Sequence, residues 1–210
     1  MKSTKDKKTE ERILESAKRI FYLKGIDGAR MQEIADEAEI NKAMLHYYFR
    51  SKEKLFDAVF AEAAGLILPK VSELLNSEMP LFRKIEYFTD KYITLLSENS
   101  VIPAFVIREM NNNPTKFFRI FNKYFSVKPE IFIKQIRKAV DEGEIIPLDP
   151  MQLHINIMSL CIFPFIARPL IMNIFGMNEK AFVNFINKRK REIPEFIINS
   201  ITNKSNKKHK

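Results

Sequence analysis

The amino-acid sequence predicts an all-α protein, and three observations support that prediction. Only five of the 210 residues are glycine, and no alternating apolar and polar run bounded by hairpin turns is present. Apolar residues instead recur three and four positions apart along most of the chain, which is the spacing of one face of an α-helix. Residues 31–50 also contain two short helical patterns separated by a turn, with a further helical pattern directly behind them.

The first expected helix begins at Thr9, whose hydroxyl can cap a helix N-terminus, and ends at Gly25, a residue type common at helix C-termini. Its apolar residues fall on one face at helical spacing: Ile13, Leu14, Ala17, Ile20 and Phe21. One side of this helix is therefore expected to be buried.

Residues 31–50 predict a helix-turn-helix. Asn41 is a good N-cap for the second helix. Each helix has an inner apolar face, made first of Ile34, Ala35 and Ala38 and then of Leu45, Tyr48 and Phe49. In such a motif the second helix enters the major groove of DNA.

The residues left on the outside of this motif are the candidate DNA contacts. The outer face of the second helix is short, mixed and aromatic, which suits base edges and phosphates, and two residues before and within the first helix are also expected at the surface. The set is Arg30, Gln32, Lys42, Ala43, Met44, His46 and Tyr47. The alternative is that the motif is only a packing unit with an ordinary polar face.

Lys52 and Lys54 point to DNA by a separate physical argument. They lie in the first turn of the next helix, which Ser51 caps, and cations are disfavoured at that positive end of the helix dipole. A phosphate at this end would accept hydrogen bonds from the free amides and neutralise both lysines. The alternative is two solvated lysines that screening tolerates.

The first 56 or so residues resemble the TetR family of bacterial transcriptional regulators. The resemblance rests on the order and spacing of Ile34-Ala35, Ile40-Asn41-Lys42, Leu45-His46-Tyr47-Tyr48-Phe49 and Ser51-Lys52-Glu53-Lys54-Leu55, with Lys24-Gly25 ahead of them. Two departures are visible. Glu39 replaces the usual glycine of the turn, so a side chain must adopt a demanding backbone conformation there. Ala29-Arg30 replaces the usual Thr or Ser before the first helix of the motif.

The rest of the chain also predicts helices. They are expected at about 52–76, 80–98, 101–112 and 115–142, the last kinked at Pro129. Asp149-Pro150 starts a helix to about Phe175, bent near Pro164 and Pro169 and ended by Gly176, and Asn178 caps a final helix to about Thr202. The expected domains are a DNA-binding head at 1–56, a helical effector-binding and dimerisation domain at 57–202, and a basic tail at 203–210.

The resemblance implies that the helices after residue 80 enclose a cavity for a small inducer. This region is rich in phenylalanine and contains a few polar residues in apolar segments, as ligand pockets do. The candidate ligand-binding residues are Phe88, Tyr92, Phe105, Arg108, Phe121 and His154. Two alternatives stand: the aromatic residues fill a core, and Arg108 and Glu109 make structural hydrogen bonds.

The last two long helices carry more apolar surface than one neighbouring helix could cover. The resemblance implies that two subunits pair them into a four-helix interface, so that two recognition helices meet an inverted repeat. The candidate interface residues are Ile157, Phe165, Phe182, Phe185, Ile186 and Phe196.

Composition is consistent with a cytoplasmic regulator. The net charge of +9 favours a polyanionic partner, although most of the excess lies in the last 24 residues. Cys161 is the sole cysteine, which excludes an intrachain disulfide and fits a reducing cytoplasm. The first ten residues are charged, unlike a signal peptide, and the apolar run 155–167 is too short to span a membrane.

No enzyme is expected, because the sequence contains no acid–base or nucleophile pair, no Gly-rich phosphate loop and no histidine at metal-ligand spacing. We therefore expect no catalytic residues, metal or cofactor. The sequence predicts a homodimeric repressor that binds an inverted-repeat operator in double-stranded DNA and is released by a small apolar or amphipathic effector. An effector-free DNA-binding protein, acting structurally or through a protein partner, is the alternative.

Overall fold

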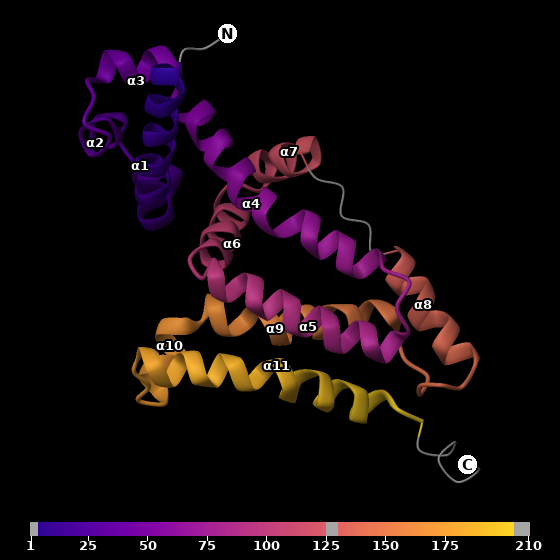
Figure 1. Ribbon diagram of the computed structural model, residues 1–210. Helices are drawn as coiled ribbons and strands as arrows, with labels where there is room; N and C mark the ends of the chain where they lie inside the picture. The colour runs from indigo at the N-terminus through magenta and orange to yellow at the C-terminus, as the bar shows by residue number, and fades with distance from the viewer. Residues whose placement is uncertain (1–3, 125–129, 204–210) are drawn as a thin grey trace. The chain divides into compact units, whose positions relative to one another are not determined.

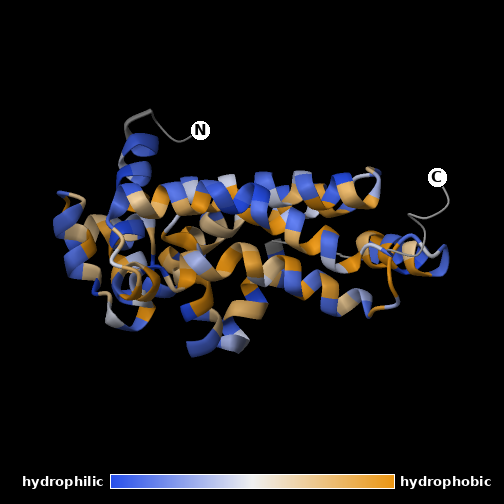
Figure 2. Cartoon of the chain, turned by 90° about the horizontal axis from the view of Figure 1, so that it is seen from below, coloured by the Kyte–Doolittle hydropathy of each residue, from blue (hydrophilic) through white to orange (hydrophobic). Residues whose placement is uncertain are grey.

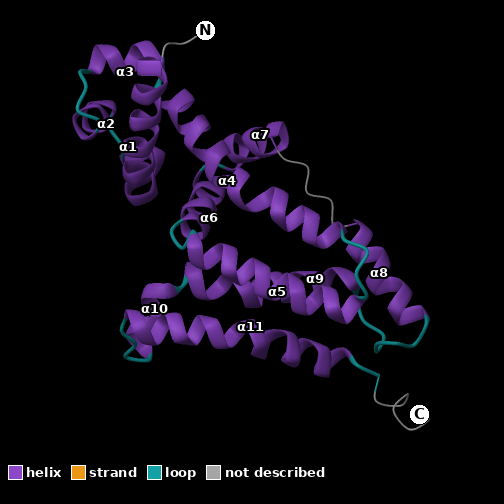
Figure 3. Cartoon of the chain, in the orientation of Figure 1, coloured by secondary structure: helices purple, strands orange, loops and turns teal. Residues whose placement is uncertain are grey.

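The computed structural model describes residues 4–124 and 130–203, and over these residues the chain is all-helical (Figures 1 and 3). This confirms the predicted fold class. The helices are α1 (Thr4–Gly28), α2 (Met31–Glu37), α3 (Lys42–Tyr48), α4 (Lys52–Asn76), α5 (Leu81–Glu98), α6 (Ile102–Asn112), α7 (Pro114–Tyr124), α8 (Glu130–Asp141), α9 (Pro150–Ile166), α10 (Arg168–Ile174) and α11 (Glu179–Ile201). Hydrophobic and hydrophilic residues lie side by side along most of them (Figure 2), as expected of amphipathic helices.

Contacts divide the chain into two compact units that are not continuous in sequence. Unit 1 comprises Met1–Leu66 and Ala104–Phe125, and unit 2 comprises Ile67–Pro103 and Ser126–Lys210. Helices α4 and α6 each have residues in both units. The segment that contains α7 therefore groups with the helix-turn-helix, although about fifty residues separate them in sequence.

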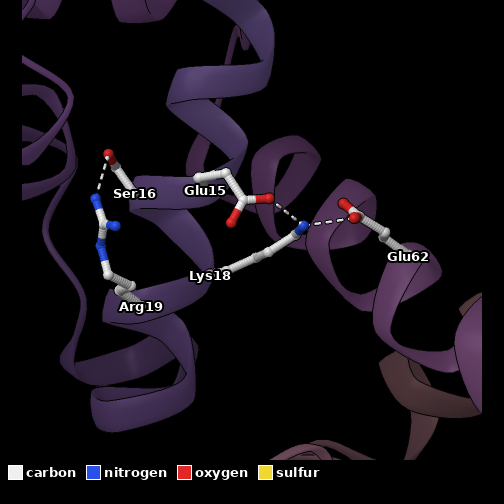
Figure 4. A network of polar contacts seen from close by, with 5 residues as sticks. All are labelled: Glu15, Ser16, Lys18, Arg19 and Glu62. Atoms are coloured by element: carbon white, nitrogen blue, oxygen red, sulfur yellow. Dashed lines mark hydrogen bonds and ion pairs between the residues drawn. The ribbon is translucent and has the colours of Figure 1, made fainter. Parts of the chain in front are cut away.

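In unit 1, α2 packs against both α1 and α3. The inner face of α1 is fully buried at Ile13, Ala17 and Phe21. Figure 4 shows a polar network on the same helix, in which the Lys18 ammonium hydrogen-bonds to Glu15 at 2.6 Å and also to Glu62 of α4. Burial by itself would lower the pKa of Lys18, but the contacts with Glu15 and Glu62 outweigh burial and raise that pKa.

The start of α1 differs from the expectation, and the end of its regular part agrees with it. Thr9 is not the N-cap, because the helix already begins at Thr4. Gly25 does end the regular part, with φ 69° and ψ −179°. A Cβ there would lie 2.9 Å from the Glu109 carboxylate, so both the backbone conformation and the close approach require glycine.

Unit 2 is built around the mutual packing of α5, α9 and α11, and α8 packs against α9. Half of α5 is buried: Leu81, Lys84, Ile85, Phe88, Thr89, Tyr92, Ile93, Leu95 and Leu96. After α8, the backbone amide of Ile146 donates to the Ile201 carbonyl at 2.8 Å, which ties this loop to the end of α11.

Two of the later expected elements are confirmed, and one is described only in part. Helices α7 and α8 lie within the helix expected at 115–142, and its expected kink at Pro129 lies outside the described residues. The helix begun by Asp149-Pro150 does bend as expected, since α9 and α10 meet at 73°. Asn178 caps α11 by accepting from the Ala181 amide at 2.9 Å. Among the described helices, none is by itself long and apolar enough to cross a membrane.

Burial corrects the expected dimer interface. Four of the six residues are between 2 and 4% exposed and belong to the core of unit 2: Ile157, Phe165, Phe182 and Ile186. A side chain buried inside its own chain cannot also cover a partner. Phe185 is half-buried, and Phe196 is 66% exposed and remains available.

Substitutions at Glu39 test the backbone conformation of the turn between α2 and α3. It has φ 50° and is the one non-glycine residue with positive φ among the described residues. Such a conformation costs about 1–3 kcal/mol for a residue with a side chain, more than the ~0.5–1 kcal/mol of chain entropy that glycine loses. Glu39→Gly should therefore raise the free energy of unfolding by up to about 1 kcal/mol in urea denaturation. Glu39→Val is the control and should lower it, because a β-branched residue fits positive φ worst. A destabilised Glu39→Gly would contradict this account of the turn.

Candidate nucleic-acid interface

Local hydrogen bonds hold the recognition helix α3 in place. The Asn41 side chain accepts from the Met44 amide at 2.7 Å, which caps the helix as expected. Leu45 is fully buried, and the Tyr48 hydroxyl donates to Asp6 of α1 at 2.9 Å. The inner face of α3 is thus fixed by packing and by one polar contact, so the orientation of its outer face is fixed as well.

The opposite face of α3 is open to solvent. Tyr47 is 79% exposed and Met44 is 42% exposed, and the remaining expected contacts on this helix are exposed too: Lys42, Ala43 and His46. Arg30 and Gln32 are also exposed, although Gln32 hydrogen-bonds to Asp36 at 2.8 Å. The structure therefore presents an ammonium, an imidazole and a phenol on one short helical surface, and such groups can bind base edges and phosphates.

The start of α4 carries the two expected phosphate contacts. Ser51 caps it by accepting from the Lys54 amide at 3.2 Å. Lys54 is exposed, whereas Lys52 is half-buried and donates to the Ala29 carbonyl at 3.2 Å. An ammonium has three donors, so Lys52 can keep this hydrogen bond and also donate to a phosphate.

Arg108 makes the structural hydrogen bonds that were the alternative to a ligand contact. Within unit 1, its guanidinium donates to the carbonyls of Phe21 at 2.7 Å, Tyr22 at 3.2 Å and Leu23 at 3.3 Å. These carbonyls lie in the turn of α1 that precedes the non-helical Gly25. Glu109 lies 3.4 Å from Arg108; its burial raises the pKa of the carboxyl, and the guanidinium works against that shift.

The structure places the six expected ligand residues in two different units. In unit 1, Phe105 packs against Phe56 and Phe60, while Phe121 stacks on Phe117. With Arg108, these residues serve the packing of unit 1. The remaining three lie in unit 2, namely Phe88, Tyr92 and His154. The ring centroids of Phe88 and Tyr92 are 5.3 Å apart, and burial lowers the pKa of His154.

Sequence analysis missed Lys84, which is 1% exposed in the interior of unit 2. Its ammonium donates to the Leu75 carbonyl at 3.2 Å and lies 5.7 Å from the centroid of the Phe132 ring. Desolvation lowers its pKa. The available signal was its position one helical turn before Phe88, which places a lysine on the apolar face of α5.

A groove runs between α9 and α11 on unit 2. Its volume is about 370 Å³, and polar and apolar residues line it, among them Gln152, Asn156, Ser159, Leu160, Phe196 and Ser200. Exposed apolar residues continue along α9 at Ile155 and Phe163, which are 53 and 56% exposed. Helix α9 is therefore apolar on its buried face and also on its solvent face.

Comparison with known proteins agrees with the architecture of unit 1. The family of bacterial regulatory proteins named the tetR family matches residues 13–59. The chain is 26% identical over 147 residues to the HTH-type transcriptional regulator UidR of Escherichia coli, covering 69% of this chain and 72% of UidR.

Solved structures have the same fold over nearly the whole length. The hemolysin II transcriptional regulator HlyIIR superposes with a TM-score of 0.61 at 25% identity, covering 94% of this chain and 99% of HlyIIR. The regulator FadR of Bacillus subtilis, solved in complex with stearoyl-CoA, superposes with a TM-score of 0.62 at 17% identity, covering 91% of this chain and 98% of FadR.

The fold and the helix-turn-helix define a DNA-binding transcriptional regulator. Residues 13–59 form a DNA-binding domain of the tetR type, as found in bacterial regulatory proteins. Among the described residues, no group of three or more His, Cys, Asp or Glu side chains is arranged to hold a metal ion. Burial raises the pKa of the Cys161 thiol to about 12, so this cysteine is an unreactive core residue.

Proposed function

We propose that this regulator is a homodimeric repressor that binds an inverted-repeat operator and is released by a small amphipathic ligand. The observation that carries the proposal is the pairing of a solvent-open recognition helix with a lysine-flanked N-terminus at α4. The first presents groups that distinguish bases, and the second presents groups that bind phosphate. The effector-free DNA-binding protein stays as the alternative, and the last experiment of this subsection separates the two.

The roles proposed for the head divide between phosphate and base. Lys52 and Lys54 contact phosphate, because they flank free amides at a helix N-terminus. Lys42, His46 and Tyr47 lie nearest the bases, because they stand on the exposed face of α3. Arg30 and Gln32 are placed at the edge of the same surface, and Ala43 and Met44 supply its apolar contacts.

Lys54→Ala and Lys52→Ala should each weaken operator binding equally for all sequences. Each removes one phosphate contact, which should reduce the slope of log K against log[salt] by about 0.9. Lys42→Ala should instead relax the preference at one base pair, at a cost of about 1–3 kcal/mol. Fluorescence anisotropy over a salt series measures both effects, with the exposed Lys180→Ala of α11 as the control that leaves the slope unchanged. A Lys54→Ala variant with an unchanged salt slope would show that this helix end lies away from DNA.

The proposed dimer pairs the solvent faces of α9 and α11 from two chains. These faces carry Ile155, Phe163 and Phe196, each more than half exposed. Large apolar residues exposed on two helices that pack together indicate a protein interface. The predicted interface thus stays with the last long helices but shifts from their buried residues to their exposed ones.

Phe196→Glu should convert the dimer to a monomer, because pairing would then bury an unmatched charge. Light scattering after gel filtration measures the mass. Leu23→Glu is the matched control, since Leu23 is 75% exposed on α1 and lies outside the proposed face. If Phe196→Glu still forms a dimer at micromolar concentration, the pairing surface lies elsewhere on the chain.

Regulation requires that unit 2 influence the head, and two continuous helices have residues in both units. Helix α4 begins at the proposed phosphate site and ends in unit 2, and α6 begins in unit 2 and carries Arg108, which binds the end of α1. A ligand that binds unit 2 and displaces either helix would change the geometry of the head. That FadR was solved with stearoyl-CoA supports an effector for this fold.

Ligand and operator should weaken each other's binding by the same factor, typically by about 1–3 kcal/mol of coupling. A ligand found by thermal-shift screening would be titrated calorimetrically into the protein with and without operator DNA. A control duplex of scrambled sequence should leave the ligand affinity unchanged. Equal ligand affinities with and without operator would reject the inducible repressor and favour the effector-free alternative.

A further inference from the structure

Lys84 is a charged residue in the interior of unit 2, where amphipathic packing would place an apolar side chain. It lies on the inner face of α5 and is 1% exposed. Among the described residues, its ammonium donates one hydrogen bond, to the Leu75 carbonyl, and forms no ion pair with a carboxylate. An ammonium has three donors, and a buried charge with unfilled donors and no counter-ion is strongly destabilising.

Two further buried polar atoms of unit 2 have unused hydrogen-bonding capacity among the described residues, and one of them belongs to a ring next to Phe132. Gln135 Oε1 and His154 Nδ1 have no hydrogen-bond partner within the described part of the chain. The Gln135 amide is held in place, since its nitrogen donates to the Met79 carbonyl at 2.7 Å. The rings of His154 and Phe132 are 5.9 Å apart, and Phe132 is also the ring against which the Lys84 ammonium lies. The Lys84 ammonium and the His154 ring therefore both lie next to Phe132, and each can form hydrogen bonds that the described residues do not supply.

The apolar partner of this polar cluster is a stripe on α5. Phe88 and Tyr92 follow Lys84 at intervals of four residues, so the three side chains lie along one face of the helix. Phe88 and Tyr92 are each 3% exposed, with ring centroids 5.3 Å apart. One face of α5 thus has a cation at one end and aromatic rings along the rest.

We propose that unit 2 binds an amphipathic carboxylate, with its anionic group at Lys84 and its apolar chain along Phe88 and Tyr92. This inference rests on the proposed function, because it names the chemical class of the effector. A carboxylate fills the free donors of Lys84 and can accept from His154. A neutral ligand leaves the ammonium uncompensated, and a cationic ligand is repelled.

A purely structural role for Lys84 is the competing explanation. Leu75 lies in the last turn of α4, where free carbonyls and the helix dipole favour a cation. That contact uses one donor, and no described residue accepts from the other two. The two explanations predict opposite effects of removing the charge.

Lys84→Met keeps the length and apolar packing of the side chain while removing its charge. If Lys84 serves a ligand, the ligand-free variant should melt about 2–4 °C higher than the wild type, because a costly buried charge is gone. If Lys84 only caps α4, the variant should melt lower. Lys91→Met, an exposed lysine on the same helix, is the control and should leave the melting temperature unchanged.

Binding is measured by calorimetry with decanoate and 1-decanol, both kept below the concentrations at which they aggregate. The wild type should bind decanoate at least about tenfold more tightly than decanol, the value of a charge-assisted hydrogen bond. Lys84→Met should lose that preference with its affinity for decanol unchanged, and Lys91→Met should keep it. Equal affinity of the wild type for the two probes, binding of neither, or a preference that survives Lys84→Met would each overturn the inference.

An operator-release assay distinguishes failure of this inference from failure of the proposed function. If decanoate binds through Lys84 but leaves operator affinity unchanged, the carboxylate site stands and the inducible repressor fails. If neutral or cationic compounds release the operator while decanoate does not bind, the repressor stands and the carboxylate site fails.

Discussion

The mutual packing of α5, α9 and α11 is the constraint on which unit 2 depends. Half of the 18 residues of α5 are buried, and each large apolar side chain among them contributes about 1.5–3 kcal/mol. Because this burial is continuous along one face, it carries Lys84 into the interior together with its apolar neighbours. The stability of the bundle offsets the cost of that buried charge.

Unit 1 depends on a different interaction, the hydrogen bonds from Arg108 to the end of α1. They reach the carbonyls of Phe21, Tyr22 and Leu23 in the turn before Gly25. The neighbouring Glu109 approaches Gly25 itself, where a Cβ would lie 2.9 Å from its carboxylate. The end of the first helix of the head is therefore set by a residue more than eighty positions later in the chain, on a helix that continues into unit 2.

The head was predictable in detail because its signals are local. The cap at Asn41, the cap at Ser51 and the positive φ at Glu39 each involve residues within a few positions of one another, and the structure confirms all three. The expected N-cap at Thr9 was wrong because α1 already begins at Thr4 in a polar segment that has no apolar spacing to reveal it, and a capping residue can also lie inside a helix.

The sequence by itself determined the all-helical class and the DNA-reading motif of the tetR type, since these follow from short-range spacing, capping and residue type. Only the tertiary structure decided which apolar residues are core and which remain exposed. Ile157, Phe165, Phe182 and Ile186 share their composition with Phe163 and Phe196, yet the first four are buried and the last two are not. The same holds for Lys84: its sequence position marks an apolar face, but its lack of a carboxylate partner among the described residues depends on side chains from other helices. Burial and charge compensation depend on residues that are far apart in the sequence, so a local sequence pattern cannot predict them.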